Sequence, residues 1–277
     1  MPSSVHRVVK GDDLLYRFFV DLFEDEGDLA TKLPGRMLAG MGIWLPLETY
    51  RTLPVLLPWV VRDHTCRGNK KKGIPDQWGA PNADGFLRDD NSLIKGLPKS
   101  LSVNRNAQTH LRGARMGSEF VASHVWRVVD HNDLASRVPL LNSFVPNLVW
   151  LPAQVAKLTD REGSPVQKAL QALAWKTYRH APVDDHLSDV VEEAWSLIPE
   201  PDADIDTEVE NWFDPTERFY TTRRSRLSDV IAALRSLEAG ESLTHKVTTT
   251  RYGEGLPHVS ESARRELLGF LERFALA

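Results

Sequence analysis

The amino-acid sequence predicts an α+β protein, and three observations lead to that prediction. Apolar residues recur at helical spacing in several segments, most clearly at 12–26 and 226–239. Two runs rich in β-branched and aromatic residues, 119–129 and 145–151, favour strands. A segment opened by Pro152, a favoured first position of a helix, follows the second run directly. The composition, 42% hydrophobic and 26% charged, is typical of a globular chain and not of a disordered one.

The elements are expected in the following order. The first third has helices at 12–26 and 28–40, followed by core connections at 42–61 that prolines interrupt. A basic loop at 62–72 comes next. After it lies a stretch at 73–118 that is rich in turn residues and contains short β-like pieces at 85–87 and 92–94. The middle has strands at 119–129 and 145–151 around a loop at 130–144, then helices at 152–160 and 165–179. The last third has an acidic helix at 186–197, a mobile stretch at 199–210, a helix at 226–239, a β-like run at 243–251 and a helix at 261–275.

Charge divides the chain unevenly. The segment 184–217, called the acidic segment below, holds 13 of the 38 Asp and Glu residues and no Lys or Arg. The remaining residues therefore carry 34 basic against 25 acidic side chains, although the whole chain sums to −4. Together with the turn-rich stretch, this predicts four regions: a mainly helical region at 1–72, a basic core at 73–183, the acidic helix and linker at 184–217, and a helical region at 218–277.

Several classes of protein are not expected. The longest apolar run, 53–61, is interrupted by Pro54 and Pro58 and is too short to cross a membrane. The first residues have neither a basic flank nor an apolar core, so no signal peptide is predicted. The single cysteine, Cys66, excludes an internal disulfide and a zinc site built on several cysteines. A cytoplasmic location is therefore expected.

The chemistry is expected between 120 and 160. A strand carries His124, a loop follows, and a second strand starts at Asn147 and leads into a helix. A histidine can act as a general base on water, and an amide oxygen can hold a Mg²⁺ ion that keeps most of its waters. Nearby Arg and Lys side chains can hold a polyanion. This combination suits hydrolysis of a phosphodiester bond.

The run NLVWLP at 147–152, followed by AKLTD at 156–160, resembles the second strand and helix of the HNH nucleases, the ββα-metal superfamily. The resemblance covers about 60 of the 277 residues. It implies an HNH-like ββα-metal core with helical additions on both sides, His124 as general base, and Asn147 as a ligand of Mg²⁺ or Mn²⁺. The sequence departs from the family pattern at Ser123, where many members have an acid or a histidine, and at Ala156, where many have a metal-binding histidine.

Further roles follow as hypotheses. Asn142 could ligate the metal instead of Asn147, or orient His124 through its side-chain amide, and Asp160 is an alternative ligand or a solvated acid. Asp89 and Asp90 are read as turn residues with a weaker catalytic alternative. The expected phosphate-binding residues are all basic and lie in the basic core or in the basic loop before it: Arg127, Arg137, Lys157, Lys70, Lys71 and Lys72.

Two functions remain open on the sequence. The first is a Mg²⁺-dependent DNA endonuclease of bacterial restriction or defence, acting as a homodimer. The second is a nucleic-acid-binding or interaction protein that keeps the HNH-like scaffold without turnover, which Ser123 and Ala156 would favour. The acidic segment is read as a solvated helix and linker, or as a block that competes with nucleic acid for the basic face.

Overall fold

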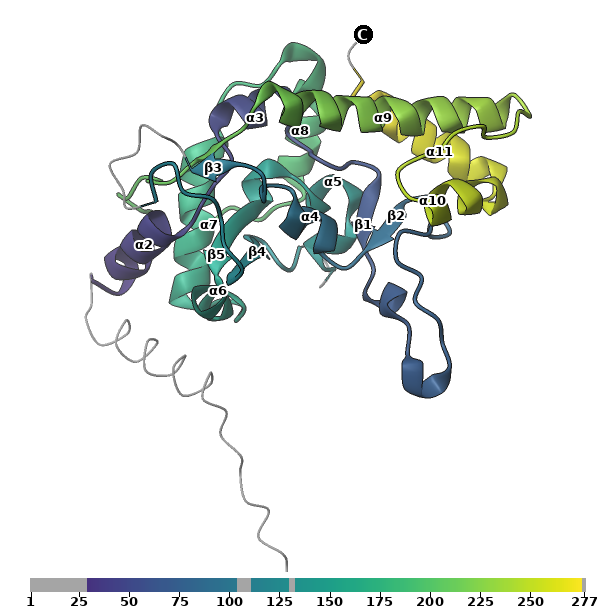
Figure 1. Ribbon diagram of the computed structural model, residues 1–277. Coiled ribbons are helices and arrows are strands. Elements are labelled where there is room, and N and C mark those ends of the chain that lie inside the picture. The colour runs from purple at the N-terminus through teal and green to yellow at the C-terminus, as the bar shows by residue number, and fades with distance from the viewer. Residues whose placement is uncertain (1–28, 104–110, 130–132, 276–277) are drawn as a thin grey trace, which may run out of the picture.

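The computed structural model describes residues 29–103, 111–129 and 133–275, so the predicted helix at 12–26 lies outside the described residues. Helices and short strands are mixed along the chain, with small two-stranded sheets, which is compatible with an α+β protein (Figure 1). The α-helices are α2 Leu29–Met41, α3 Leu47–Thr52, α4 Ser92–Gly96, α5 Pro139–Asn142, α6 Ala153–Thr159, α7 Pro165–Tyr178, α8 Ser188–Ser196, α9 Glu217–Glu238, α10 Thr250–Gly255 and α11 Glu261–Glu272. The strands are β1 Val60–Arg62, β2 Leu87–Asp89, β3 Ser102–Val103, β4 Phe120–His124, β5 Leu148–Pro152 and β6 Phe213–Asp214.

The hairpin of β4 and β5 leads directly into α6. The two strands are antiparallel, with His124 opposite Leu148 and Phe120 opposite Pro152. Strand β5 is buried from Leu148 to Leu151 and runs through the core, whereas β4 is mostly half-buried. Helix α6 begins at Ala153 and packs against both strands. The order of two strands and a helix that the sequence predicts for this region is therefore present.

The other two sheets join distant parts of the chain. Strand β1 pairs with β2 in parallel, and β3 pairs with β6 in antiparallel orientation. These pairs link residues on opposite sides of the predicted boundaries at 72 and 184. Buried apolar residues from α2 to α11 form one continuous cluster, with α2 packed on α7 and α9 packed on α11. Helix α9 runs along one edge of the molecule, with α10 and α11 beside its far end (Figure 1).

Three predicted β segments differ from the structure. Residues 92–94 lie in α4, because the Asp89 carboxylate accepts hydrogen bonds from the Ser92 hydroxyl and from the Leu93 N–H (2.9 Å) and so starts a helix there. The run 243–251 forms no strand, and Thr248 has a left-handed φ of 52° that would break one. The strand predicted at 119–129 stops at His124, because the next N–H groups bond to Asn147 rather than to a neighbouring strand.

The acidic segment is more structured than the sequence suggests. Helix α8 buries Val190, Val191 and Trp195 in the core. The predicted mobile stretch 199–210 packs against α2 and buries Ile205. Just beyond it, the Asn211 side chain donates to the Gly40 carbonyl (2.9 Å). The stretch is polar in composition, but its few apolar side chains pack against the core. Helix α9 also begins nine residues before the predicted start at 226.

Candidate active site in the basic cavity

A cavity of about 640 Å³ lies between β4, α6 and the chain around β1. We call it the basic cavity, because its wall carries several positive side chains and a single acid, Asp160, among the described residues. Ser123 and Ala156, the two positions that depart from the HNH pattern, also line it. Besides His124, the basic side chains in the wall are Arg62, His64, Arg127, Arg137 and Lys157.

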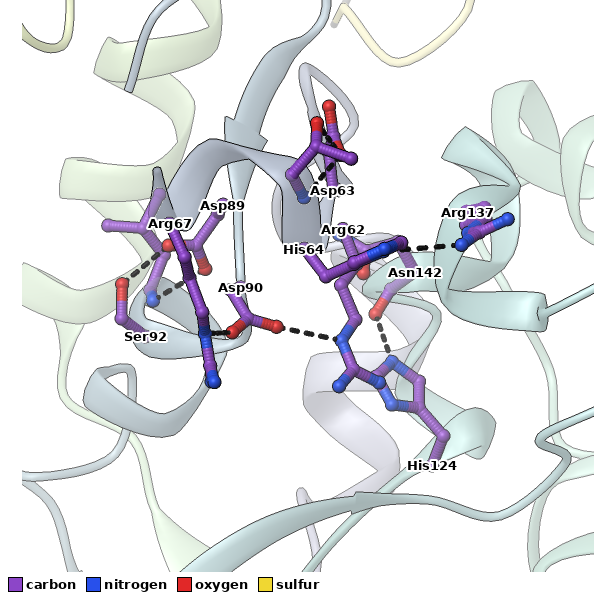
Figure 2. A network of polar contacts seen from close by, with 12 residues as sticks. Arg62, Asp63, His64, Arg67, Asp89, Asp90, Ser92, His124, Arg137 and Asn142 are labelled. Atoms are coloured by element: carbon purple, nitrogen blue, oxygen red, sulfur yellow. Dashed lines mark hydrogen bonds and ion pairs between the residues drawn. The ribbon is translucent and has the colours of Figure 1, made fainter. Parts of the chain in front are cut away.

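His124 is the last residue of β4, and its side chain reaches the cavity wall while only 8% of the residue is exposed. Its Nε2 lies 3.0 Å from the backbone carbonyl oxygen of Asn142 (Figure 2). A carbonyl oxygen only accepts hydrogen bonds, so Nε2 must carry the hydrogen and Nδ1 keeps its lone pair. The ring is thus held in the tautomer that a general base needs.

The electrostatic surroundings keep His124 neutral. Its pKa is lowered to about 4, chiefly by burial, and the positive charges of Arg62 and Arg127 contribute to this value. The Asn142 carbonyl acts in the opposite direction but is the weaker effect. Near neutral pH the imidazole therefore has a free lone pair.

The structure gives the two predicted asparagines roles in positioning. Asn147 is fully buried; its Oδ1 accepts the Trp126 N–H (2.8 Å), and its Nδ2 donates to the Leu141 carbonyl (3.1 Å). It joins the chain after β4 to the chain before β5 and does not line the cavity. Asn142 orients His124, as one hypothesis expected, but through its backbone carbonyl. Its side-chain amide instead donates to the Val60 carbonyl (2.9 Å).

Arg62 is a residue of this site that the sequence analysis missed. It ends β1, lines the cavity, and lies beside the His124 ring (Figure 2). Its Nε lies 3.1 Å from Asp90 Oδ1, and the Asp90 side chain, 1% exposed, also pairs with Arg67. Asp90 therefore positions two arginines. The parallel pairing of β1 with β2, which brings Arg62 opposite Asp89, could not be predicted from the local sequence.

The predicted phosphate-binding residues fall into two groups. Arg127, Arg137 and Lys157 line the basic cavity, and Arg137 Nη2 lies 3.3 Å from Nδ1 of His64 across its rim. Lys71 and Lys72 are exposed in a short 3-10 helix of the loop that joins β1 to β2 and projects from the body (Figure 1). Lys70 belongs to the same turn, but its side chain lies outside the described residues. Lys71 and Lys72 do not line the cavity.

Two oxygen-bearing side chains in the cavity wall suit a hard divalent cation. Asp160 is exposed and lies 3.8 Å from Arg127 Nε through its Oδ1. Asn91, held in a left-handed conformation with φ of 65°, has a buried Oδ1 without a hydrogen-bond partner. Among the described residues, no group of three or more His, Cys, Asp or Glu side chains could hold a metal ion. An ion here would keep most of its waters, as Mg²⁺ commonly does.

Comparisons of the chain with protein-family models, with curated proteins and with solved structures give no match. Over the described part of the chain, no helix has the length and apolar character needed to span a membrane. The function is therefore inferred from the geometry of the basic cavity.

Proposed function

We propose that this protein is an endonuclease that hydrolyses phosphodiester bonds of DNA in the basic cavity. The observation that carries the proposal is the state of His124: neutral, held by a backbone carbonyl, and placed in a wall that also carries arginines. The succession of β4, β5 and α6 supports it, because the HNH resemblance implies this order around a catalytic histidine. Bacterial restriction or defence is the setting that we propose.

In the proposed reaction, Nδ1 of His124 removes a proton from a water molecule as the water oxygen attacks phosphorus. A new P–O bond forms, the bond to the leaving sugar oxygen breaks, and that oxygen takes a proton from solvent. The hydrogen on Nε2 remains directed at the Asn142 carbonyl, which steadies the imidazolium that forms. The charged base returns its proton to solvent afterwards, and its low pKa favours that release.

The arginines of the cavity wall hold the substrate. Arg62 and Arg127 lie close enough to His124 to lower its pKa, so a phosphate that they bind would lie near the base. Arg137 and Lys157 extend the positive surface around it. Guanidinium groups bind phosphate oxygens through two parallel hydrogen bonds and stabilise the charge that develops in the transition state.

Magnesium or manganese is the proposed cofactor. Asp160, whose exposed carboxylate lines the cavity, is the residue that would hold it, and the ion would neutralise charge on the scissile phosphate. Asn147, the ligand expected from the resemblance, has its oxygen engaged by the Trp126 N–H. In this proposal it maintains the loop that carries the Asn142 carbonyl.

A plasmid-nicking assay tests the proposal. Supercoiled plasmid is incubated with the wild-type protein and Mg²⁺, Mn²⁺ or EDTA, and with two variants checked for native circular dichroism. We expect His124→Ala to lower the cleavage rate by roughly 10²–10⁴-fold. The matched control, His245→Ala, removes an exposed histidine outside the cavity and should leave the rate unchanged. Cleavage by His124→Ala at the wild-type rate would exclude this base.

A second candidate function, binding of nucleic acid without turnover, is favoured by Ser123 and Ala156, which leave the cavity wall without two groups that many HNH enzymes use. It predicts no cleavage but salt-sensitive DNA binding. The double variant Lys71→Ala/Lys72→Ala should then weaken binding and reduce the slope of log affinity against log salt by about 1–2. Cleavage that requires His124 would exclude this candidate, and binding without any cleavage would favour it.

A further inference from the structure

Helix α9 carries a charged residue on its buried face, at a position where its helical spacing predicts an apolar residue. Its buried stripe runs through Phe219, Leu227, Val230 and Leu234. Arg223 lies one turn after Phe219 and one turn before Leu227, on the same stripe. Its guanidinium carbon lies 5.8 Å from the centre of the Phe219 ring. The side chain is thus directed inward, along the face that packs on the body.

This side chain lines a second cavity, of about 130 Å³, which we call the α9 cavity. Its wall is largely apolar and is formed by the chain before β1, by α9 and by Phe274. The basic side chains in its wall are Arg223, Arg224 and His186. No carboxylate lines it among the described residues.

The Arg223 guanidinium lacks a compensating charge. Its Nε is buried without a hydrogen-bond partner, and the guanidinium forms no ion pair with a described carboxylate. Its pKa is lowered to about 10, chiefly by burial and in part by the nearby charge of Arg226; no acid acts in the opposite direction. The residue as a whole is half-buried, and a charge that is partly removed from water without an ion-pair partner is unfavourable. An external anion in the cavity would supply the missing partner.

We propose that the α9 cavity binds a small oxyanion, a carboxylate or a phosphate monoester with a short apolar body. The head group would contact Arg223 and Arg224, because the planar guanidinium matches both kinds of oxyanion. The apolar body would lie against Leu53, Trp59 and Leu227. The volume equals that of about four water molecules in the liquid, which limits the ligand to a head group and a few carbons.

The proposal is tested on the full chain with butyrate, inorganic phosphate and butylammonium as probes. Thermal unfolding and the NMR signals of the arginine Nε–H groups report binding. We expect butyrate or phosphate to raise Tm by roughly 2–4 °C and to shift the Arg223 signal, whereas butylammonium does neither. Butyrate alone would assign a carboxylate head, and phosphate alone a phosphate head.

Two variants complete the experiment. Arg223→Met keeps an unbranched apolar stem and removes the charged guanidinium, so it should fold and lose at least tenfold in anion affinity. Arg226→Met, on the same helix but outside the cavity wall, should respond like the wild type. The proposal fails if neither anion changes Tm or the NMR signals, or if Arg223→Met responds as strongly as the wild type. It also fails if Arg223→Met weakens only DNA binding, because α9 would then belong to a nucleic-acid surface.

Discussion

The two cavities treat their arginines in opposite ways. In the basic cavity, Arg62 pairs with the buried Asp90, and Arg127 lies 3.8 Å from Asp160. Both arginines line the cavity, and each therefore has a carboxylate beside it. In the α9 cavity, Arg223 is desolvated and has no such acid. The first arrangement positions charge for a substrate. The second leaves the charge of Arg223 for a bound anion to neutralise. Substitutions in the two cavities should therefore change the stability of the protein in opposite directions.

The largest expected effect on stability comes from Asn147, which connects the chain segments that form the wall of the basic cavity. Asn147→Asp keeps the oxygen that accepts the Trp126 N–H but loses the N–H that reaches the Leu141 carbonyl, and it buries a carboxylate. We expect the free energy of unfolding to fall by about 3 kcal/mol or more, measured by urea denaturation. Gln154→Glu, the same change on an exposed position of α6, should have little effect. Unchanged stability together with tighter Mg²⁺ binding would instead support Asn147 as a ligand.

The neutral His124 makes stability depend on pH. Its pKa is about 4 when folded and about 6.5 when unfolded, so between these values the unfolded chain binds more protons. Stability should therefore fall by about 3 kcal/mol as the pH drops from 6.5 to 4. Urea denaturation at several pH values checks this. His124→Gln should lose that part of the pH dependence; an identical pH profile in this variant would show that other groups cause it.

Asp90→Asn breaks the pairing that distinguishes the basic cavity. It leaves Arg62 and Arg67 without their carboxylate, and because Asp90 is buried while both arginines reach solvent, we expect a loss of about 2 kcal/mol in unfolding free energy. Arg62 should also lose its fixed position, which would lower the cleavage rate. Asp76→Asn, at an exposed acid 3.9 Å from Arg251, serves as the control. Wild-type stability of Asp90→Asn would show that the pairing does not position Arg62.

The smallest effect, and the one of opposite sign, is expected in the α9 cavity. Arg223→Met removes a half-buried charge whose Nε has no hydrogen-bond partner, so in buffer without small anions the free energy of unfolding should rise slightly, by less than about 1 kcal/mol. Arg226→Met should change it little. A clear loss of stability on Arg223→Met would mean that the guanidinium has a partner within the protein, and the contrast between the two cavities would disappear.

Sequence patterns predicted the local order of the chain better than its pairing. The helices at 165–179 and 261–275 and the strand before Pro152 are found within a few residues, because each depends on its own apolar pattern and capping residues. The sequence also identified His124 and three of the basic residues in the cavity wall. It missed Arg62, because the parallel pairing of β1 and β2 that positions it is a tertiary feature. It placed Asn91 in a turn, where the residue indeed has a left-handed φ, but did not expect it in the cavity wall. It also underestimated the order of 199–210, where composition suggested mobility but Ile205 finds a place in the core.

The register of β4 and β5 also limits which changes in chain length the site can tolerate. His124 ends β4 opposite Leu148, and this position brings its Nε2 within 3.0 Å of the Asn142 carbonyl oxygen. Insertion of a single residue within 120–123 would shift the register by one residue and disturb this contact, even if every other residue kept its identity. A redesign of this protein can therefore lengthen the exposed loop between β1 and β2, but it must keep the spacing from Phe120 to His124 fixed.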